Sequence, residues 1–336
     1  MKVPIVLYLL VSGCAVPSVD EQENFVKDDD ECDFMCGGNS PKIDHLGFHD
    51  LHMWGGLPSK NGFRLAGFRD PSGKPQGLAV TGAQIKGIST VPNTPPLIGA
   101  SLIGSQFTVT RDNTSTQYLI KIADVGRVDY WAKLRGAVKQ AVTYRLQWAQ
   151  ITNVDPVFED ICSKTADAGG ISDFHAVVFE GDRVDAERKV DTEVDLHWFN
   201  IGCAGHLLAK LHLMGHTEGA KVGAGFATKL DERTTVVKML SADYCGRGKA
   251  FTVAGVELTW RDDKSWMALS PITALIEARF GPNGATCLDT PRLLANPTDE
   301  GTALFPDLMK AIEDECAMPP ACDQNTPGTH IFSANP

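Results

Sequence analysis

The feature that most constrains the fold is the number of cysteines in a chain that begins with an export signal. Nine cysteines occur among 336 residues. The chain starts with a basic residue, Lys2, an apolar run from Val3 to Val11 and small residues before Cys14, as secretory signals do. Exported proteins fold in oxidising compartments, where cysteines pair. We therefore expect disulfides among the even set that remains after Cys14: Cys32, Cys36, Cys162, Cys203, Cys245, Cys287, Cys316 and Cys322.

The stretch VSGC that ends at Cys14 resembles the lipobox of bacterial lipoproteins. In those proteins the thiol is lipidated and the cysteine becomes the first residue of the mature chain. Acyl chains then hold it in the membrane by burying methylenes, at about 0.8 kcal/mol each. The alternative is an ordinary secretory signal cut nearby, which also implies export.

Ala15 follows Cys14, whereas an aspartate there retains lipoproteins in the inner membrane of enteric bacteria. We therefore predict a signal peptide over residues 1–13 and a lipid anchor at Cys14. The expected location is the bacterial cell envelope, in the outer membrane.

Composition argues against several classes of partner. The net charge of -11 comes from 42 acidic and 31 basic residues. Nucleic acid is therefore not expected as a partner, because binding it requires basic patches. No run of roughly 18 apolar residues is present to span a bilayer. We predict no cofactor, and the expected partners are the membrane, through the lipid anchor, and an unidentified envelope ligand.

Composition also divides the chain beyond the signal peptide into four segments. Residues 14–60 begin with a polar, acidic stretch that predicts a solvated tether. Residues 61–110 carry a faint repeat of pentads with glycine first and an apolar residue fourth, which predicts short strands and turns. Residues 111–300 are expected to form the main domain, and residues 301–336 a C-terminal helix and tail.

Periodicity in the main domain predicts both strands and helices. The stretches SQFTVT, QYLIKIADV, AVTYRLQWAQI and DFHAVVFEG are rich in β-branched and aromatic residues, as strands are. The stretch CAGHLLAKLHLMGH has apolar residues at helical spacing and places His212 and His216 on its polar face, where we expect surface histidines. The stretch DERTTVVKMLSADYCG predicts a second helix, capped by Asp231 and ending at Gly246.

Two hairpins and a tail helix complete the expected elements. AFTVAGVELTW should turn at Ala254 and Gly255, and TALIEARFGPNGATCL should place Cys287 on its return strand. FPDLMKAIEDECAMPPAC predicts a short helix that ends before two prolines. The expected fold class is α+β, with a β-rich core and a few short amphipathic helices, stapled by disulfides and preceded by the glycine-pentad segment.

Three histidines form the best candidate metal site. His45, His49 and His52 follow i, i+4, i+7 spacing. On a helix this spacing places three imidazoles on one face, where they would bind zinc or copper. The run is short and a glycine interrupts it, so a solvated polar segment is the alternative.

The stretch SADYCGRG, with CAGHLLAK upstream and EARFGPNGATCL downstream, resembles the bacterial ADYC-domain family, which is named after this motif. The likeness runs from about Asp195 to Leu288. It implies an exported lipoprotein and does not point to a particular activity. Cys203, Cys245 and Cys287 match cysteines of the family pattern.

The chain departs from that pattern at three positions. Leu211 and Val236 stand where the family has two further cysteines, and both lie on apolar stripes. The resemblance therefore implies that these two positions are paired with each other in relatives. Arg247 stands where the family has an aspartate after CG, which weakens the case for an essential acid at that point.

The resemblance and the cysteine count together suggest a disulfide pattern. Each bridge would stabilise the fold by about 2–4 kcal/mol. Other pairings among the four central cysteines remain open. The expected pairs are Cys245–Cys287, Cys162–Cys203, Cys32–Cys36 and Cys316–Cys322.

Three functions follow as hypotheses. The first is a disulfide-stapled binding or structural module at the cell envelope. The alternative is a cysteine-dependent hydrolase or transferase, with Cys245 as the nucleophile, His206 as its base and Asp243 orienting the histidine. Cys245 follows a predicted helix C-terminus, where the helix dipole disfavours a thiolate. The second alternative is a metal-binding protein that uses the three histidines.

Overall fold

A computed structural model gives the structure of the chain. Cys14, Cys32 and Cys36 lie outside the described residues, and so do the expected signal peptide, lipid site and first disulfide loop. The structure describes residues 39–112, 114–131, 140–152, 154–164, 170–181, 183–184, 190–191, 197–217, 230–253, 255–261, 276–322 and 331–335.

The largest element is a curled antiparallel sheet of ten strands in the order β3-β14-β11-β9-β8-β7-β4-β5-β6, with β10 beside β9. The sheet curls so that its last strand, β6, and the turn before β6 contact strands β9 and β11 nearer its middle. The Ile85 amide on β6 donates to the Tyr144 hydroxyl on β9 at 2.8 Å, and the Glu180 amide on β11 donates to the Gly82 carbonyl at 3.1 Å. The strands are β3 (Asp50–His52), β4 (Phe63–Arg69), β5 (Pro75–Thr81), β6 (Gln84–Ser89), β7 (Gln106–Arg111), β8 (Gln117–Asp129), β9 (Gln140–Gln150), β10 (Glu159–Asp160), β11 (His175–Glu180) and β14 (Trp198–Cys203).

The inner face of this sheet is filled by apolar side chains. Alternation along the strands directs one set of residues inward, as in a sheet with one buried face. The cavity left between Phe107, Leu146 and Ile201 has about 10 Å³, roughly the room that one water needs. This cavity is too small for a ligand, so the interior of the sheet is a packed core.

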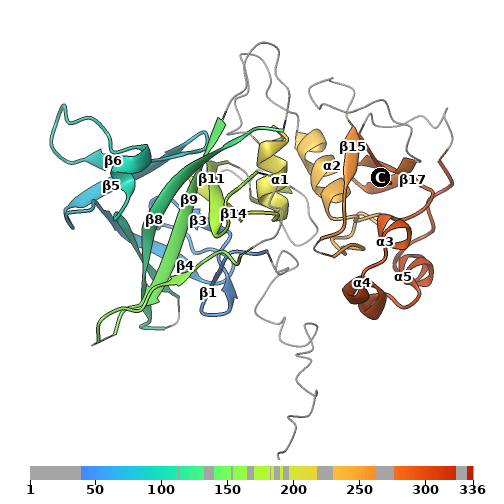
Figure 1. Ribbon diagram of the computed structural model, residues 1–336, viewed down its shortest axis with the longest axis horizontal. Helices are drawn as coiled ribbons and strands as arrows, with labels where there is room; N and C mark the ends of the chain where they lie inside the picture. The colour runs from blue at the N-terminus through green and yellow to red at the C-terminus, as the bar shows by residue number, and fades with distance from the viewer. Residues whose placement is uncertain are drawn as a thin grey trace, which may run out of the picture.

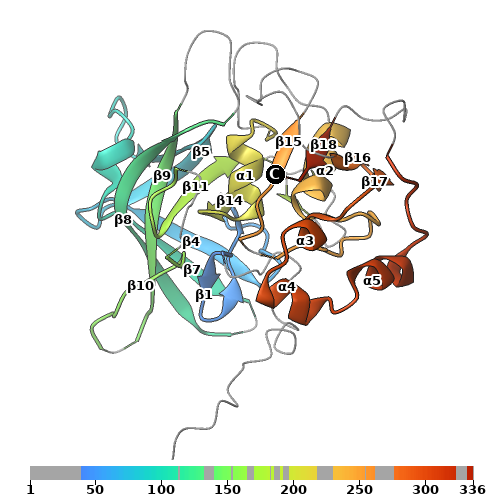
Figure 2. The same ribbon diagram turned by 45° about the vertical axis from the view of Figure 1, so that its right-hand side comes forward.

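A second, four-stranded sheet in the order β15-β18-β16-β17 lies beyond two helices, α1 and α2, which run side by side between the sheets (Figure 1 and Figure 2). Helix α1 packs on β11 and β14, and α2 packs on β16 and β17. The strands are β15 (Thr259–Arg261), β16 (Ile276–Gly281), β17 (Gly284–Leu288) and β18 (Phe332–Ala334). The helices are η1 (Gly99–Leu102), α1 (Leu207–Leu213), α2 (Leu230–Leu240), α3 (Arg292–Ala295), α4 (Asp299–Leu304) and α5 (Leu308–Glu315).

Two small ribbons complete the structure. They are β1 (Lys42–Ile43) with β2 (Leu46–Gly47), and β12 (Arg183–Val184) with β13 (Val190–Asp191). The first ribbon and β3 lie in the segment that we assigned to the tether, yet Ile43 and Leu51 are buried in the core. This part of the assignment was wrong because acidic composition identified the tether, whereas the few apolar residues after residue 40 are enough to dock the chain on the sheet.

The predicted class is confirmed: the fold is β-rich and α+β, with short helices and disulfides. The glycine-pentad segment forms β4–β7 and η1, and these strands continue the main sheet through the pairing of β7 with β8. The predicted strands before α1 and both central helices are present. The tail helix and the second hairpin are also confirmed, the latter with Cys287 on its return strand.

The first predicted hairpin is not formed by the described residues. Phe251 lies outside any strand, and its ring packs against Tyr244 with 5.9 Å between ring centroids. Strand β15 pairs with β18 from the C-terminal end of the chain. A partner about 70 residues away in sequence is not visible to local periodicity, and it replaces the hairpin partner that we expected.

His212 and His216 are fully buried, which corrects the prediction of surface histidines. The His212 ring stacks on Phe179 at 4.5 Å between centroids, and its two nitrogens contact the Tyr130 and Thr217 hydroxyls, each at 2.7 Å. Burial lowers the pKa of His212 to about 3. The supposed polar face of α1 is thus a second packing face, covered by β11 and its neighbours.

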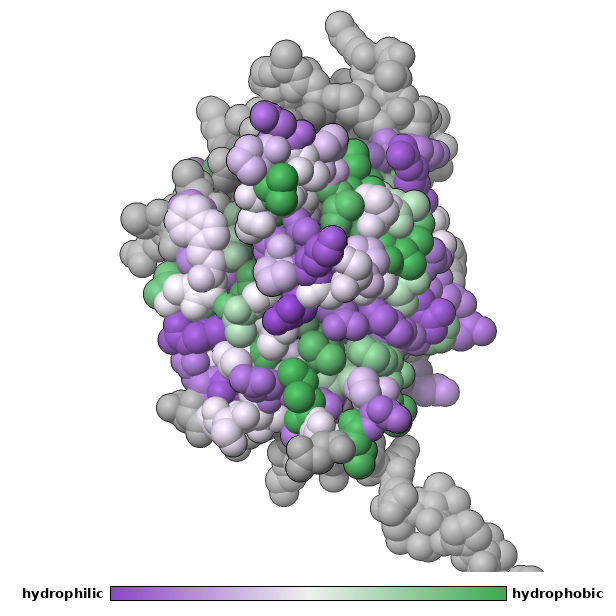
Figure 3. All heavy atoms as spheres, turned by 90° about the vertical axis from the view of Figure 1, so that its left-hand side faces the viewer, coloured by the Kyte–Doolittle hydropathy of each residue, from purple (hydrophilic) through white to green (hydrophobic). Residues whose placement is uncertain are grey.

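Exposed aliphatic residues occur at the end of the molecule formed by β5 and β6. They include Ile88, Val91, Ile98 and Ile103. Figure 3 shows apolar and polar residues interleaved on the described part of this face. Scattered exposed apolar residues are normal on protein surfaces, so they do not mark a docking site by themselves.

Candidate functional site

The ADYC motif forms the turn that ends α2. Ala242 adopts a left-handed conformation with φ 50°. The Ala242 amide donates to the Met239 carbonyl at 3.1 Å, and the Asp243 amide donates to the Lys238 carbonyl at 2.9 Å. These two bonds are those of a Schellman motif, which satisfies the last carbonyls of a helix and reverses the chain. The helix therefore ends at Leu240, six residues before the predicted end. The sequence did not reveal this end because alanine occupies the left-handed position where glycine is usual.

Asp243 holds the loop that follows this turn. Its carboxylate lies 2.7 Å from the Lys238 ammonium, and both side chains are fully buried. The amides of Gly248 and Arg247 donate to the same carboxylate at 2.7 and 3.2 Å, and Lys238 also donates to the Gly246 carbonyl at 3.0 Å. A buried ion pair is tolerated only when both charges are matched and hydrogen-bonded, as these are.

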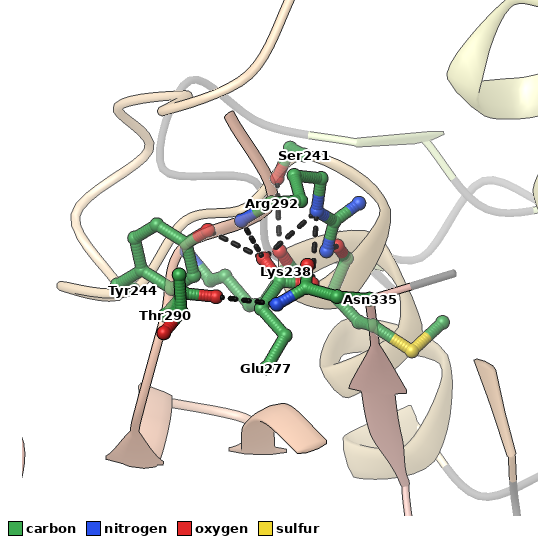
Figure 4. Close-up of polar contacts among 8 residues, drawn as sticks. Lys238, Ser241, Tyr244, Glu277, Thr290, Arg292 and Asn335 are labelled. Carbon is green, nitrogen blue, oxygen red and sulfur yellow. Dashed lines mark hydrogen bonds and ion pairs between the residues drawn. The ribbon is translucent and has the colours of Figure 1, made fainter. Parts of the chain in front are cut away.

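Tyr244 belongs to a second buried charge cluster, drawn in Figure 4. Its hydroxyl donates to Glu277 of β16, and Arg292 of α3 contacts both carboxylate oxygens of Glu277 at 2.9 and 3.1 Å. Arg292 also donates to the Met239 carbonyl at 2.8 Å. The cluster thus ties α2, β16 and α3 together.

Burial and charge act in opposite directions on this cluster. Burial would raise the pKa of Glu277, but the charge of Arg292 and the hydrogen bonds from Arg292 and Tyr244 outweigh it, so the pKa is lowered. Burial, with the neighbouring Glu277 carboxylate, raises the pKa of Tyr244 well above its usual value. Tyr244 is therefore a neutral hydrogen-bond donor to an ionised carboxylate.

Two glycines allow the motif to contact the hairpin of β16 and β17. A Cβ on Gly246 (φ 70°) would lie 2.0 Å from the Asn283 carbonyl oxygen, and one on Gly284 (φ 107°) would lie 2.6 Å from the Gly246 amide nitrogen. The Ala285 amide donates to the Tyr244 carbonyl at 2.8 Å. The two turns therefore meet backbone to backbone, which side chains at these positions would prevent.

Cys245 is bonded to Cys316 at the end of α5, with 5.6 Å between their Cα atoms. Cys287 is bonded to Cys322. The expected pairs Cys245–Cys287 and Cys316–Cys322 are therefore wrong, whereas Cys162–Cys203 is confirmed.

The position of the chain after α5 explains the difference. The Leu288 amide donates to the Pro320 carbonyl and the Cys322 amide to the Asp289 carboxylate, each at 2.9 Å. These bonds place residues 320–322 along the end of β17, beside Cys287. Cys316 is then left next to the ADYC turn, where it pairs with Cys245.

The residues of the catalytic hypothesis are not arranged for catalysis. The Cys245 sulfur is part of a disulfide and is not a thiol. The Asp243 carboxylate is occupied by Lys238 and two loop amides. His206 lies at the start of α1, where its Nδ1 accepts from the Leu208 amide at 3.3 Å as a helix cap. The arrangement that the hypothesis requires is thus not formed.

The residues of the metal hypothesis are also not gathered. His45 lies in the turn between β1 and β2, His49 lies between β2 and β3, and His52 lies on β3. The segment is extended, so the helical spacing does not bring the rings to one face. Among the described residues, no group of three or more His, Cys, Asp or Glu side chains is placed to hold a metal ion.

Comparison with known families decides the relationship of the chain. The ADYC domain matches residues 99–294, from η1 into α3, which is more than half of the chain. The chain belongs to the ADYC-domain family. The match is longer than the core predicted from three stretches, and it leaves Cys316 and Cys322 outside. No curated protein and no solved structure matches the chain.

In this ADYC domain the sequence reasoning missed Lys238, Glu277 and Arg292. Each is buried and binds a residue of the motif or a neighbour of it. A signal existed for the first two, because Lys238 interrupts the apolar run VVKML and Glu277 lies within the predicted strand IEARF. A charge inside a buried segment requires a partner. The partner itself is set by the fold and is not visible in the local sequence.

Proposed function

We propose that the chain is an exported, lipid-anchored protein of the bacterial cell envelope, in which the ADYC domain is a disulfide-stapled binding or structural module. The observation that carries this proposal is the structural use of the polar groups of the motif. Asp243 is paired with a buried lysine, Tyr244 donates to a buried carboxylate, and Cys245 is bonded to Cys316. Groups held in this way maintain a fold and are not available to a substrate.

Three disulfides support the exported location, because such bonds accumulate in oxidising, extracytoplasmic compartments. The helices in the described part of the chain are all too short or too polar to cross a membrane. The VSGC stretch at Cys14 supports a lipid as the anchor.

The anchor is tested by labelling bacteria that express the full chain with an alkyne analogue of palmitate. We expect the label on the wild-type protein in the membrane fraction, and none on Cys14→Ser. Cys32→Ser is the matched control, since it removes a nearby cysteine and should keep the label. A wild-type protein that is exported without the label contradicts the anchor.

The module is tested by blocking free thiols in the native protein and mapping its disulfide-linked peptides. A linked Cys245–Cys316 peptide is expected. A blocked, unpaired Cys245 in the mature protein would contradict the proposal and would favour a cysteine-dependent enzyme instead.

A further inference from the structure

Trp54 is the one aromatic residue among the strongly exposed large apolar side chains of the described residues, with 67% of its surface exposed. Leaving a large apolar side chain in water forfeits the stabilisation that its burial would provide. Tryptophan at a surface is characteristic of contact sites, because its indole offers a wide apolar face and a polar N–H group.

The turn that presents Trp54 is fixed by backbone hydrogen bonds. The Met53 amide donates to the His197 carbonyl at 2.6 Å, and the Gly55 amide donates to the His52 carbonyl at 3.0 Å. Gly55 has φ 66°, and a Cβ there would lie 2.0 Å from a carbonyl oxygen of β4. The indole therefore lies in solvent on a tight turn in which residue 55 must be glycine.

The far side of the same turn is also anchored. The Gly56 amide donates to Nδ1 of His52 at 3.1 Å, and the Gly56 carbonyl accepts from Arg64 at 2.7 Å. Arg64 in turn makes two bonds to the Asp112 carboxylate, at 2.6 and 2.9 Å. A surface aromatic on such a support loses little conformational entropy when it binds a ligand.

A series of ring contacts connects Trp54 to Arg183. The His197 ring lies 3.3 Å from the indole, centroid to centroid, and inclined by 32°. His52 contacts both rings edge-on, at 6.3 and 6.1 Å. The buried Trp198 ring lies 5.3 Å from His52, and the Arg183 guanidinium covers it at 4.0 Å.

Arg183 is itself oriented by Asp50, whose carboxylate accepts from its Nε at 2.6 Å. Arg183 remains partly exposed, with 30% of its side chain accessible. The exposed indole is thus connected to the Arg183 guanidinium through the buried rings of His52 and Trp198. We name Trp54, His197 and Arg183 the Trp54 platform.

We propose that the Trp54 platform binds a pyranose ring of a neutral glycan. The His197 ring covers one face of the indole, so the apolar C–H face of a pyranose matches the opposite face of this exposed side chain. The hydroxyl groups of the glycan pair with donors and acceptors such as imidazole and guanidinium. The net charge of -11 disfavours a polyanionic polymer. This inference rests on the proposed function and names the ligand class of the module.

The test is affinity electrophoresis of the native protein in gels that contain glucomannan, hydroxyethylcellulose or laminarin, together with sedimentation on purified peptidoglycan sacculi. We expect retention of the wild-type protein by at least one polymer. Trp54→Ala should weaken retention by at least about tenfold, the equivalent of one lost 1.4 kcal/mol contact. Val157→Ala is the matched control, because Val157 is 81% exposed in another loop and should bind as the wild type does.

Arg183→Lys tests the polar part of the platform, since lysine keeps the charge beside Asp50 but lacks the planar fork. We expect several-fold weaker retention. Far-UV circular dichroism and thermal unfolding of each variant establish that the fold is intact.

Three results would overturn the proposal. They are a wild-type protein that no polymer and no sacculus retains, retention that is unchanged in Trp54→Ala, and Trp54-dependent binding to phosphatidylethanolamine–phosphatidylglycerol vesicles or self-association in place of glycan binding. Lipid labelling at Cys14 is read in a separate assay. A labelled protein that binds no glycan therefore contradicts the platform and leaves the proposed function standing.

Discussion

The ammonium of Lys238 lies 2.7 Å from the carboxylate of Asp243, and water reaches neither side chain. The pair joins the last turns of α2 to the loop that follows it. Removing two charges from water is costly, and their attraction offsets that cost only while both are present with their other hydrogen bonds. The motif is therefore most sensitive to the loss of one partner.

Asp243→Asn tests this relationship. The substitution leaves the Lys238 ammonium buried without its counter-charge, and we expect a loss of about 3–5 kcal/mol in the free energy of unfolding. Urea denaturation at neutral pH measures it.

The matched control for that measurement is Glu315→Gln. It breaks the pair between Lys249 and Glu315, which are 3.3 Å apart and partly exposed, at 48% and 26%. An exposed pair contributes about 0–1 kcal/mol. Equal, small losses in both variants would show that the buried pair is not important for stability.

Replacing both Cys245 and Cys316 by serine should release α5 from the ADYC turn. A disulfide that closes a loop of this length, with its cysteines 71 residues apart, contributes about 2–4 kcal/mol by restricting the unfolded chain. We expect that loss in denaturant unfolding, and faster hydrogen exchange in α5 before the rest of the domain. The variant with Cys162 and Cys203 both changed to serine is the control, since it should lose stability while the α5 amides stay protected. Unchanged exchange in α5 of the first variant would contradict a tethering role.

Local patterns in the sequence were sufficient for most of the elements. Strand β9 alternates along AVTYRLQWAQ, and α1 repeats its leucines at helical spacing, so neighbouring residues alone specify both. The Cys162–Cys203 pair was also predicted. The strand and the helix depend on short-range order. The cysteine pair was predicted as the complement of Cys245–Cys287, a pair that the structure does not contain.

The elements that were missed depend on contacts between distant residues. Cys287 pairs with Cys322 because residues 320–322 run beside β17. β15 finds its partner in β18, and the His212 ring finds Phe179 on another strand. The Schellman turn at Ala242 was missed for a local reason, since alanine seldom adopts the left-handed conformation. Periodicity does not report these relationships, whereas the three-dimensional fold does.

The family pattern leads to a prediction about α1 and α2. The resemblance to the family implies that two cysteines stand in relatives at the positions of Leu211 and Val236. Both residues are buried in one apolar cluster, and the two helices pack against each other. Changing both to cysteine should create a fourth disulfide among the described residues. Peptide mapping after thiol blocking would show the linked peptide, and unfolding should become harder in the oxidised form than in the reduced form. The single variant Leu211→Cys is the control for an isolated buried thiol, and two blocked, unpaired thiols in the double variant would contradict the pairing.

The buried His212 leads to a prediction about pH. Its pKa is about 3 in the folded protein because burial disfavours the imidazolium, whereas the pKa of a histidine in the unfolded chain is 6.5. The unfolded chain therefore binds a proton that the folded chain does not, so stability is present above about pH 6.5 and is lost as the pH falls toward 3. The slope is about 1.4 kcal/mol per pH unit, or about 2 kcal/mol between pH 6.5 and 5. Urea midpoints are measured across that range for wild type and His212→Gln. The loss of stability per pH unit should be smaller in the variant, by the contribution of one histidine. Other groups, among them the buried His175 with its lowered pKa, still contribute to the pH dependence of the variant. Identical slopes in the two proteins would mean that His212 is not neutral in the fold.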